Sequence, residues 1–203
     1  MDLHEAIYTL RAMRRLKTDP VPEALIWKVL DAAIRAPSGG NLQPWAFVVV
    51  TDPTKKATIG EWYLDGWKQT YGKAPDMPAD SPFMRTFRSA DHLANNIASV
   101  PVLIFACVQA ARTASVSGLG PNIFPAVQNL MLAARAEGLG TTLTTLHRSH
   151  EAEVRELLGV PDGFETMAMI PMGWPKGNFG TGPRRPVEDV TYWDSWGATK
   201  AKA

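Results

Sequence analysis

Two side-chain amides stand in a glycine-containing loop, and their chemistry suits a flat polar ligand. Residues 36–45 run Ala-Pro-Ser-Gly-Gly-Asn-Leu-Gln-Pro-Trp and lead directly into an apolar segment. Because glycine has no Cβ, Gly39 and Gly40 let the backbone approach a ligand closely and adopt positive φ. Asn41 and Gln43 each carry a donor and an acceptor, which matches the alternating C=O and N–H edge of a flavin. The same residue types are common in helix-to-strand loops, so the segment alone is consistent with a ligand site or with a simple turn.

Cations gather near both ends of the chain. The first group consists of Arg11, Arg14, Arg15 and Lys17, with no acid among them, and the second is the pair Arg184-Arg185 after a Gly-Pro break. The planar guanidinium group suits phosphate oxygens. Arg11 and Arg15 share a helix face if a helix extends that far. The two groups are consistent with a split phosphate site, and also with solvated surface charges.

Several other chemistries lack the residues that they need. The chain has four His and one Cys, and His147 and His150 have no third ligand at zinc spacing, so no metal site is predicted. No Gly-x-Ser-x-Gly or Cys/His signature favours acyl transfer. A phosphate loop and a Gly-x-Gly-x-x-Gly fingerprint are both absent. We therefore assign no catalytic side chain.

The composition is that of an ordinary single-domain globular protein. Its 203 residues are 45% hydrophobic and 20% charged, and the net charge is +1. Neither nucleic acid nor an anionic membrane is therefore expected as a partner. No apolar run reaches the roughly 18 residues of a membrane helix, and the N-terminus lacks the features of a secretory signal. Cys107 has no second cysteine to pair with, and we expect a cytoplasmic location.

Helix and strand patterns alternate along the chain and must position these residues. Capping residues, breakers and helical periodicity predict helices over 2–11, 22–36, 54–72, 82–97, 123–137 and 150–158. Apolar runs predict strands over 45–50, 101–108, 141–146 and 165–173. The proline-rich segment 72–82 is expected to be a loop, and residues 175–203 a tail rich in Gly, Pro and Trp. The pattern favours an α/β or α+β class.

Together these segments resemble the nitroreductase family of FMN-dependent oxidoreductases. The resemblance is carried by residues 11–23, 36–45, 125–141, Gly173 and 183–186, and it spans about residues 5–190. It implies an α+β fold of three layers, α/β/α, in which helices flank a mixed, largely antiparallel sheet of four to five strands. It also implies an intertwined homodimer with FMN at each of two interface sites. Residues 1–203 would form one FMN-binding domain, with residues 175–203 extending onto the partner subunit.

The resemblance also implies roles for individual residues. Arg11, Ala12, Met13 and Arg15 correspond to N-terminal phosphate and ring contacts, although Met13 can serve only through its backbone. Arg184 or Arg185 would contact the phosphate from the other end of the chain. The flavin would be lined by Pro37, Ser38, Gly39 and Asn41, with Gln43 added from the partner subunit. Backbone N–H groups of Thr144, Thr145 and Leu146 would face the reactive flavin nitrogen.

The implied activity is that of an NAD(P)H-dependent FMN oxidoreductase, in which the flavin carries the chemistry. NAD(P)H would deliver a hydride and leave, and a nitroaromatic, quinone or activated alkene would then bind, which is a ping-pong cycle. Residues 62–88 and 110–124 are expected to cover the acceptor pocket. Its aromatic candidates, which core or interface packing explains equally well, are Trp62, Tyr63, Trp67, Tyr71, Phe83 and Phe124. Two alternatives are flavin processing or O₂-dependent oxidation on the same fold, and a non-catalytic flavin-binding protein.

Overall fold

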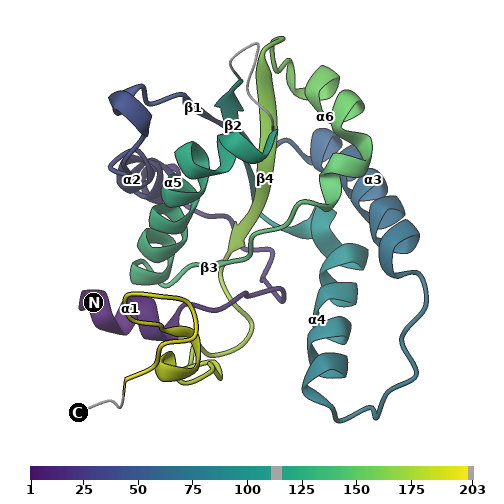
Figure 1. Ribbon diagram of the computed structural model, residues 1–203. Helices are drawn as coiled ribbons and strands as arrows, with labels where there is room; N and C mark the ends of the chain where they lie inside the picture. Colours follow the sequence, from purple (N-terminus) through teal and green to yellow (C-terminus); the bar gives the residue numbers. More distant parts are fainter. Residues whose placement is uncertain (111–115, 201–203) are drawn as a thin grey trace.

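A four-stranded antiparallel sheet forms the centre of the protein (Figure 1). The computed structural model describes residues 1–110 and 116–200. The sheet has the order β1-β2-β4-β3, and all three strand pairings in this part of the chain are antiparallel. Its strands are β1 (Trp45–Val50), β2 (Val102–Gln109), β3 (Gly140–Thr141) and β4 (Phe164–Gly173). The strand number and the antiparallel character agree with the fold expected from the sequence.

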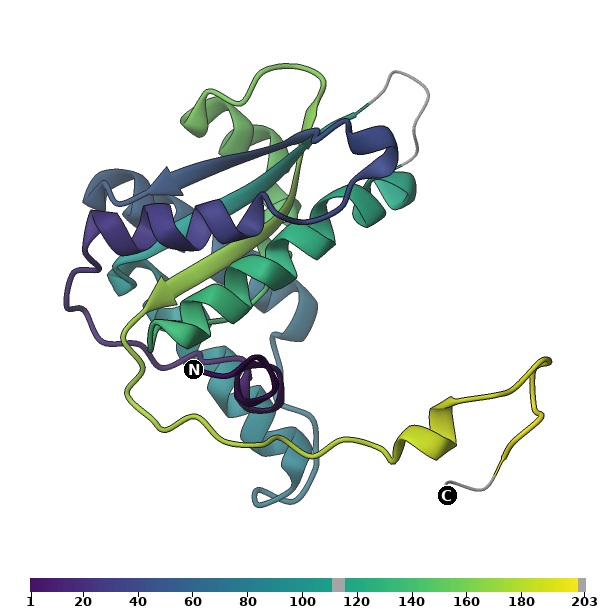
Figure 2. The same cartoon turned by 90° about the vertical axis from the view of Figure 1, so that its left-hand side faces the viewer.

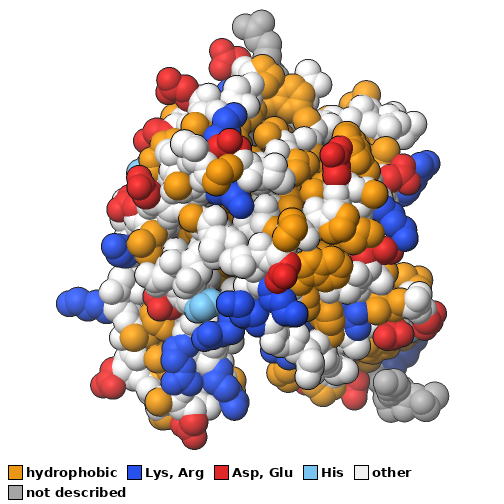
Figure 3. Space-filling view, turned by 180° about the vertical axis from the view of Figure 1, so that it is seen from behind, with side chains coloured by type: hydrophobic (Ala, Val, Ile, Leu, Met, Phe, Trp, Pro, Cys, Tyr) orange, Lys and Arg blue, Asp and Glu red, His pale blue; other side chains and the backbone are white. Residues whose placement is uncertain are grey.

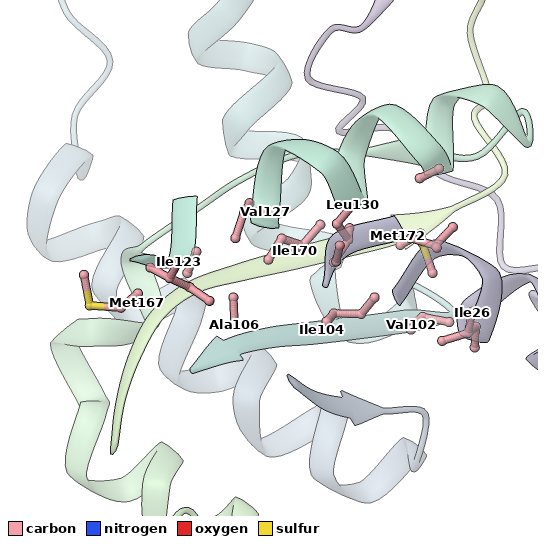
Figure 4. Close-up of a cluster of buried hydrophobic side chains, with 14 of the residues drawn as sticks. Ile26, Val102, Ile104, Ala106, Ile123, Val127, Leu130, Met167, Ile170 and Met172 are labelled. Atoms are coloured by element: carbon pink, nitrogen blue, oxygen red, sulfur yellow. The ribbon is translucent and has the colours of Figure 1, made fainter. Parts of the chain in front are cut away.

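Helices cover both faces of the sheet. One face carries α2 (Glu23–Ala33) and α5 (Val116–Ala136), and the other carries α3 (Pro53–Tyr71), α4 (Pro82–Asn96) and α6 (Glu151–Leu158). Alternate side chains of a strand point to opposite faces, so Ile104 packs in the first core and Phe105 in the second. Figure 4 shows the first core, where Val127 and Leu130 of α5 lie over Ile170. The expected α/β/α layering is confirmed.

Capping residues explain where the two helices that flank the proline-rich loop begin. The carboxylate of Asp52 accepts a hydrogen bond from the Lys55 amide at 2.8 Å, one turn into α3. The hydroxyl of Ser81 does the same for the Met84 amide in α4. Each cap is followed by a proline at the first helical position, where a missing N–H costs nothing. Both helices begin and end within one residue of the predicted bounds. Short 3₁₀ turns also occur at η1 (Gly39–Asn41), η2 (Ile97–Ser99), η3 (Leu146–His150) and η4 (Val187–Val190).

The long helix α5 begins seven residues earlier than predicted. The sequence predicted a start at residue 123, because Gly118, Gly120 and Pro121 resemble a break. The helix instead begins at Val116 and includes both Pro121 and Pro125. A proline inside a helix removes a backbone hydrogen bond and costs about 3 kcal/mol. Burial of the apolar face of this helix in the first core offsets that cost, so tertiary packing overrides the local signal.

The N-terminal helix is shorter than predicted, and this changes the position of the first basic group. Helix α1 spans Leu3–Thr9, and Asp2 makes no side-chain cap bond, so the predicted capping box does not form. The chain is extended from Leu10, and the amide of Met13 donates to the carbonyl of Thr141 at 2.8 Å. Arg11 and Arg15 therefore do not share a helix face.

Two other predicted elements differ from the structure. Helix α2 ends at Ala33 rather than at residue 36, because Pro37 has no N–H to donate and its ring would clash with the helical carbonyl of Ala33 four residues earlier. The strand predicted over 141–146 is reduced to β3, beyond which only Thr144 forms a bridge, to Met169. The chain then leaves the sheet and continues into α6.

The C-terminal segment runs along α1 and then leaves the body of the molecule. Figure 2 shows that its last part projects away from the three layers. Trp196 in this part is 90% exposed. The placement of residues 175–203 on a partner subunit stays a prediction, and residues 201–203 lie outside the described chain. Within the described chain, no helix is both long and apolar enough to cross a membrane.

Candidate active site

Three cavities open beside the extended segment formed by residues 11–15. The aromatic cavity has a volume of about 350 Å³, and its wall residues include Tyr63, Trp67 and Tyr71. The terminal cavity, of about 320 Å³, is lined by Arg11 and Arg184 from opposite ends of the chain. The basic cleft, of about 220 Å³, is lined by Arg15 and Lys176. Among the described residues that line these three cavities there is no carboxylate.

The aromatic cavity is walled by one face of α3 and one face of α4. Tyr63, Trp67 and Tyr71 are spaced four residues apart on α3, which places them in a row. Phe83 and Phe87 of α4 complete the wall. The ring of Trp67 lies 4.8 Å from that of Tyr71 and 5.3 Å from that of Phe87, centroid to centroid. Four of the six predicted pocket aromatics therefore meet in one cavity.

Residues 142–146 form the floor of the aromatic cavity and are held by hydrogen bonds. The buried hydroxyl of Tyr63 lies 2.9 Å from that of Thr144, and burial raises the pKa of this tyrosine. The Thr144 amide donates to the carbonyl of Met169 at 3.0 Å, and the Leu146 amide donates to the Thr144 hydroxyl at 3.4 Å. Of the three backbone donors predicted here, only the Thr145 amide has no acceptor among the described residues.

The terminal cavity brings together the two basic groups of the sequence. Thr141 lines it together with Arg11 and Arg184, and the buried Thr141 hydroxyl has no hydrogen-bond partner among the described residues. Arg185 lines none of the three cavities and donates to the carbonyl of Asp189. The guanidinium groups of Arg11, Arg14 and Arg184 and an unpaired donor, with no carboxylate in the lining, form a set that suits an anion.

Arg14 is the residue that sequence reasoning passed over. It lines all three cavities, whereas Arg15 lines only the basic cleft. Burial lowers the pKa of the Arg14 guanidinium. Arg14 and Arg15 meet only in the basic cleft, and Arg14 alone of the two reaches the aromatic and terminal cavities. No local sequence signal identifies Arg14, because the path of this segment depends on the hydrogen bond from the Met13 amide to the distant Thr141 carbonyl.

Loop 36–45 lies away from the three cavities of the chain. Its Gly39 amide donates to the side chain of Asn122, near the start of α5, whereas the terminal cavity is lined by Gln128 and Met131 further along that helix. No residue of the loop lines any of the three cavities. Pro37, Ser38, Gly39, Asn41 and Gln43 therefore do not meet the predicted arginine contacts within one chain.

The loop is held in an unusual conformation. Gly40, Asn41 and Gln43 all have positive φ, of 57°, 54° and 49°. Residues other than glycine seldom adopt this region, and Gln adopts it less often than Asn. The Ser38 hydroxyl accepts from the Gln43 amide at 2.9 Å, and the Gln43 side chain donates to that of Asn41 at 3.1 Å. The two amides are thus presented together on an exposed turn.

Two predicted pocket aromatics lie elsewhere in the chain. Trp62 is one residue from Tyr63, which turns it about 100° around the helix axis, and it stacks on His150 with ring centroids 6.1 Å apart. Phe124 lies on α5, where it is 39% exposed and faces Gly120. Neither lines the aromatic cavity. Of the predicted cover 110–124, residues 111–115 lie outside the described chain, and residues 116–124 begin α5.

Residues 7–174 match the model of the family described as the nitroreductase family. The chain belongs to this family. It is 30% identical to a protein of Thermus thermophilus named NADH dehydrogenase, over 95% of this chain and 96% of that protein.

Solved structures of nitroreductase-fold proteins are similar to the whole chain. One is iodotyrosine deiodinase bound to FMN and 3-iodo-L-tyrosine, with a TM-score of 0.77 and 22% identity, covering 96% of this chain and all (100%) of that one. Another is the NADPH:FMN oxidoreductase of Vibrio harveyi complexed with NAD⁺, with a TM-score of 0.73 and 21% identity over 98% and 79% of the two chains. At these identities the two structures establish the shared fold.

Proposed function

We propose that this nitroreductase-family protein is an FMN-dependent oxidoreductase that takes a hydride from NAD(P)H and reduces a flat organic acceptor. The observation that carries the proposal is the meeting, along residues 11–15, of an anion-suited terminal cavity and an aromatic cavity. Arg14 lines both of them. A cofactor with a phosphate at one end and a flat ring at the other fits this arrangement. The name of the Thermus relative also supports oxidation of NADH.

The residues of the terminal cavity fit the phosphate of FMN. Arg11 and Arg184 would hold the phosphate oxygens, and the unpaired Thr141 hydroxyl would donate a further hydrogen bond. Arg14, at the boundary of the two cavities, would face the ring and stabilise negative charge there. The open Thr145 amide is the backbone donor available on the floor. When bound, FMN supplies hydride acceptance and donation.

The aromatic cavity is proposed as the site that reductant and acceptor occupy in turn. Its volume of about 350 Å³ is within the range of small-ligand sites. Tyr63, Trp67 and Tyr71 offer ring faces and edges to a flat molecule such as a nicotinamide, quinone or nitroaromatic. Because one cavity serves both, the reductant must leave before the acceptor enters, which is the physical basis of a ping-pong cycle.

We further propose a homodimer in which loop 36–45 of each subunit completes the site of the other. The loop presents the side-chain amides of Asn41 and Gln43 together, yet it lies apart from the cavities of its own chain. The exposed tail with Trp196 is proposed to pack on the partner. The whole loop, rather than Gln43 alone, is then contributed by the partner subunit. We also propose a cytoplasmic location, because the only thiol, Cys107, is buried and cannot form an intrachain disulfide.

The first test is direct. The purified protein should be yellow, and NADH or NADPH should bleach its flavin absorbance in the absence of oxygen. Turnover of a quinone or nitroaromatic under the same conditions separates this proposal from an oxygen-dependent oxidase. A colourless protein that takes up no FMN contradicts the proposal, and bound FMN that no nicotinamide reduces indicates a non-catalytic binding protein.

Subunit complementation tests the shared site. Arg184→Ala removes a contact proposed for one subunit, and the double substitution Asn41→Gly/Gln43→Gly removes the loop amides while keeping positive φ accessible. Each variant alone should lose FMN. In a random mixture, half of the dimers are hybrids, and one of their two sites carries no substitution, so about a quarter of the parental sites should return. No recovery after verified subunit exchange contradicts the shared site.

A further inference from the structure

The basic cleft is a second concentration of positive charge, and two of its cations, Arg15 and Lys176, have no part in the FMN assignment. It is lined by Arg11, Arg14, Arg15 and Lys176, with Ser89 of α4 and Asn178 as neutral polar members. Figure 3 shows Lys and Arg side chains gathered around a hollow on this side of the molecule, next to a histidine. Arg184 does not line this cavity. FMN has one phosphate, and the proposed assignment already gives it Arg11, Arg184 and the Thr141 hydroxyl in the terminal cavity.

These cations have no anionic partners in the part of the chain that the structure describes. None of the four forms an ion pair or donates a side-chain hydrogen bond there, whereas Arg35, Arg135, Arg148 and Arg155 all lie within 4.0 Å of a carboxylate oxygen. The net charge of the whole chain is only +1, so the concentration is local. Grouping like charges without counter-charges raises their free energy. Such a cluster is stabilised by an anionic ligand.

The backbone holds two of these cations side by side. The Lys176 amide donates to the Arg15 carbonyl at 2.9 Å, and the Lys17 amide donates to the Trp174 carbonyl at 2.7 Å. The two hydrogen bonds pair residues 15–17 with residues 174–176 as a short ribbon. The positive charges of Arg15 and Lys176 also help to lower the pKa of His92, after the larger effect of its burial. The two cations are therefore close together before any ligand binds.

The basic cleft adjoins the aromatic cavity. Arg14 lines both, and α4 contributes Ser89 to the cleft and the neighbouring Ala90 to the aromatic cavity. A ligand that fills the aromatic cavity with a flat ring therefore has a polyanion-binding surface beside it. NADPH has this composition, with a nicotinamide ring at one end and a ribose phosphomonoester at the other.

We propose that the basic cleft binds the 2′-phosphate of NADPH through Arg15 and Lys176, and so makes the protein select NADPH over NADH. This inference rests on the proposed function, because it requires the aromatic cavity to receive the nicotinamide. A phosphomonoester adds about two negative charges at neutral pH. Both side chains are exposed, and solvent screens their charges, so two charge-assisted hydrogen bonds to it account for a preference of about 10- to 100-fold.

The test compares NADPH with NADH on the FMN-loaded protein at one acceptor concentration. The parent should show a higher kcat/KM for NADPH, and Arg15→Gln/Lys176→Gln should reduce the NADPH-to-NADH ratio by about 10- to 100-fold. Lys17→Gln is the matched control, because Lys17 lies in the same ribbon but lines none of the three cavities. Its ratio should equal that of the parent.

Binding of 2′,5′-ADP, which carries the 2′-phosphate but no nicotinamide, is measured by calorimetry beside 5′-AMP. The double variant should bind 2′,5′-ADP more weakly and leave 5′-AMP binding as in the parent. An equal NADPH-to-NADH ratio in parent and variant overturns the inference, as does loss of FMN from the variant, which would make the cleft the flavin phosphate site. If the proposed function fails and neither nucleotide reduces the protein, 2′,5′-ADP binding still tests whether the cleft binds the 2′-phosphate. That measurement needs no hydride transfer.

Discussion

Arg135 holds the two ends of the chain next to the terminal cavity, and we predict that FMN affinity depends on it. This arginine of α5 is only 7% exposed. Its Nε donates to the Thr9 hydroxyl at 2.9 Å, and its Cζ lies 4.0 Å from the ring centroid of Phe179. Thr9 is two residues before Arg11, and Phe179 is five residues before Arg184. One buried side chain thus positions both arginines proposed for the phosphate.

The perturbation is Arg135→Lys, which keeps the charge but loses the planar guanidinium. The lost hydrogen bond contributes about 1 kcal/mol, and the weakened cation–π contact up to about 2 kcal/mol because it is desolvated. We expect the free energy of unfolding to fall by about 1–3 kcal/mol. If Arg184 is also released, FMN binding loses a charged contact of about 1.5–3 kcal/mol, which corresponds to a 10- to 100-fold weaker Kd.

The assay titrates apo-protein with FMN and with riboflavin, followed by flavin fluorescence. Riboflavin lacks the phosphate, so Arg135→Lys should weaken FMN binding and leave riboflavin binding close to that of the parent. In an Arg11→Ala/Arg184→Ala background, which lacks both positioned arginines, the substitution should weaken FMN no further. The control is Arg148→Lys, which alters a half-buried arginine that is paired with Glu151. Equal weakening of both flavins would refute the positioning role and leave a purely structural one.

Three further predictions concern the same framework. Gly140→Ala places a Cβ 2.8 Å from that of Met13, so urea unfolding should show a loss of about 1–3 kcal/mol, whereas Gly177→Ala, with nothing within 4 Å, should be neutral. Burial lowers the pKa of His147 from 6.5 to about 4, so the unfolded chain binds its proton first on acidification. Stability should be complete above about pH 6.5 and should fall by up to about 3 kcal/mol towards pH 4, a slope that His147→Gln removes in urea titrations at several pH values. Trp67→Phe removes the 3.0 Å hydrogen bond to Asp91 and part of the aromatic wall, and should raise the KM of aromatic acceptors about 2- to 10-fold in steady-state assays.

The strands and most helices were predictable because their signals are local. β1, β2 and β4 are apolar runs whose side chains fill both cores, and they lie within one residue of the predicted bounds. The start of α5 was not predictable, because only burial in the first core keeps Pro121 inside a helix. At Pro121 local propensity disfavours a helix and tertiary packing favours one, and the residue is helical.

The candidate site was predictable in its parts rather than in its assembly. The sequence indicated that arginines from both chain ends would share a cavity, and Arg11 and Arg184 do. It did not distinguish Arg14 from Arg15, because their directions depend on the hydrogen bond between Met13 and Thr141, more than a hundred residues apart. Side-chain type is encoded locally, but direction at this site is set by a distant backbone partner.

The position of loop 36–45 would link flavin binding to dimer formation in the proposed arrangement. Its amides are fixed near the start of α5, while the terminal cavity lies further along the same helix. Helix α5 separates them within one chain, and in the proposed dimer the amide and phosphate contacts act on one flavin across two subunits. A ligand that binds the assembled state and not the separate chains stabilises that state by mass action. Under the proposed arrangement, flavin binding and dimer stability are therefore one linked equilibrium, and the strained backbone at Asn41 and Gln43 is maintained for a partner's site rather than for its own.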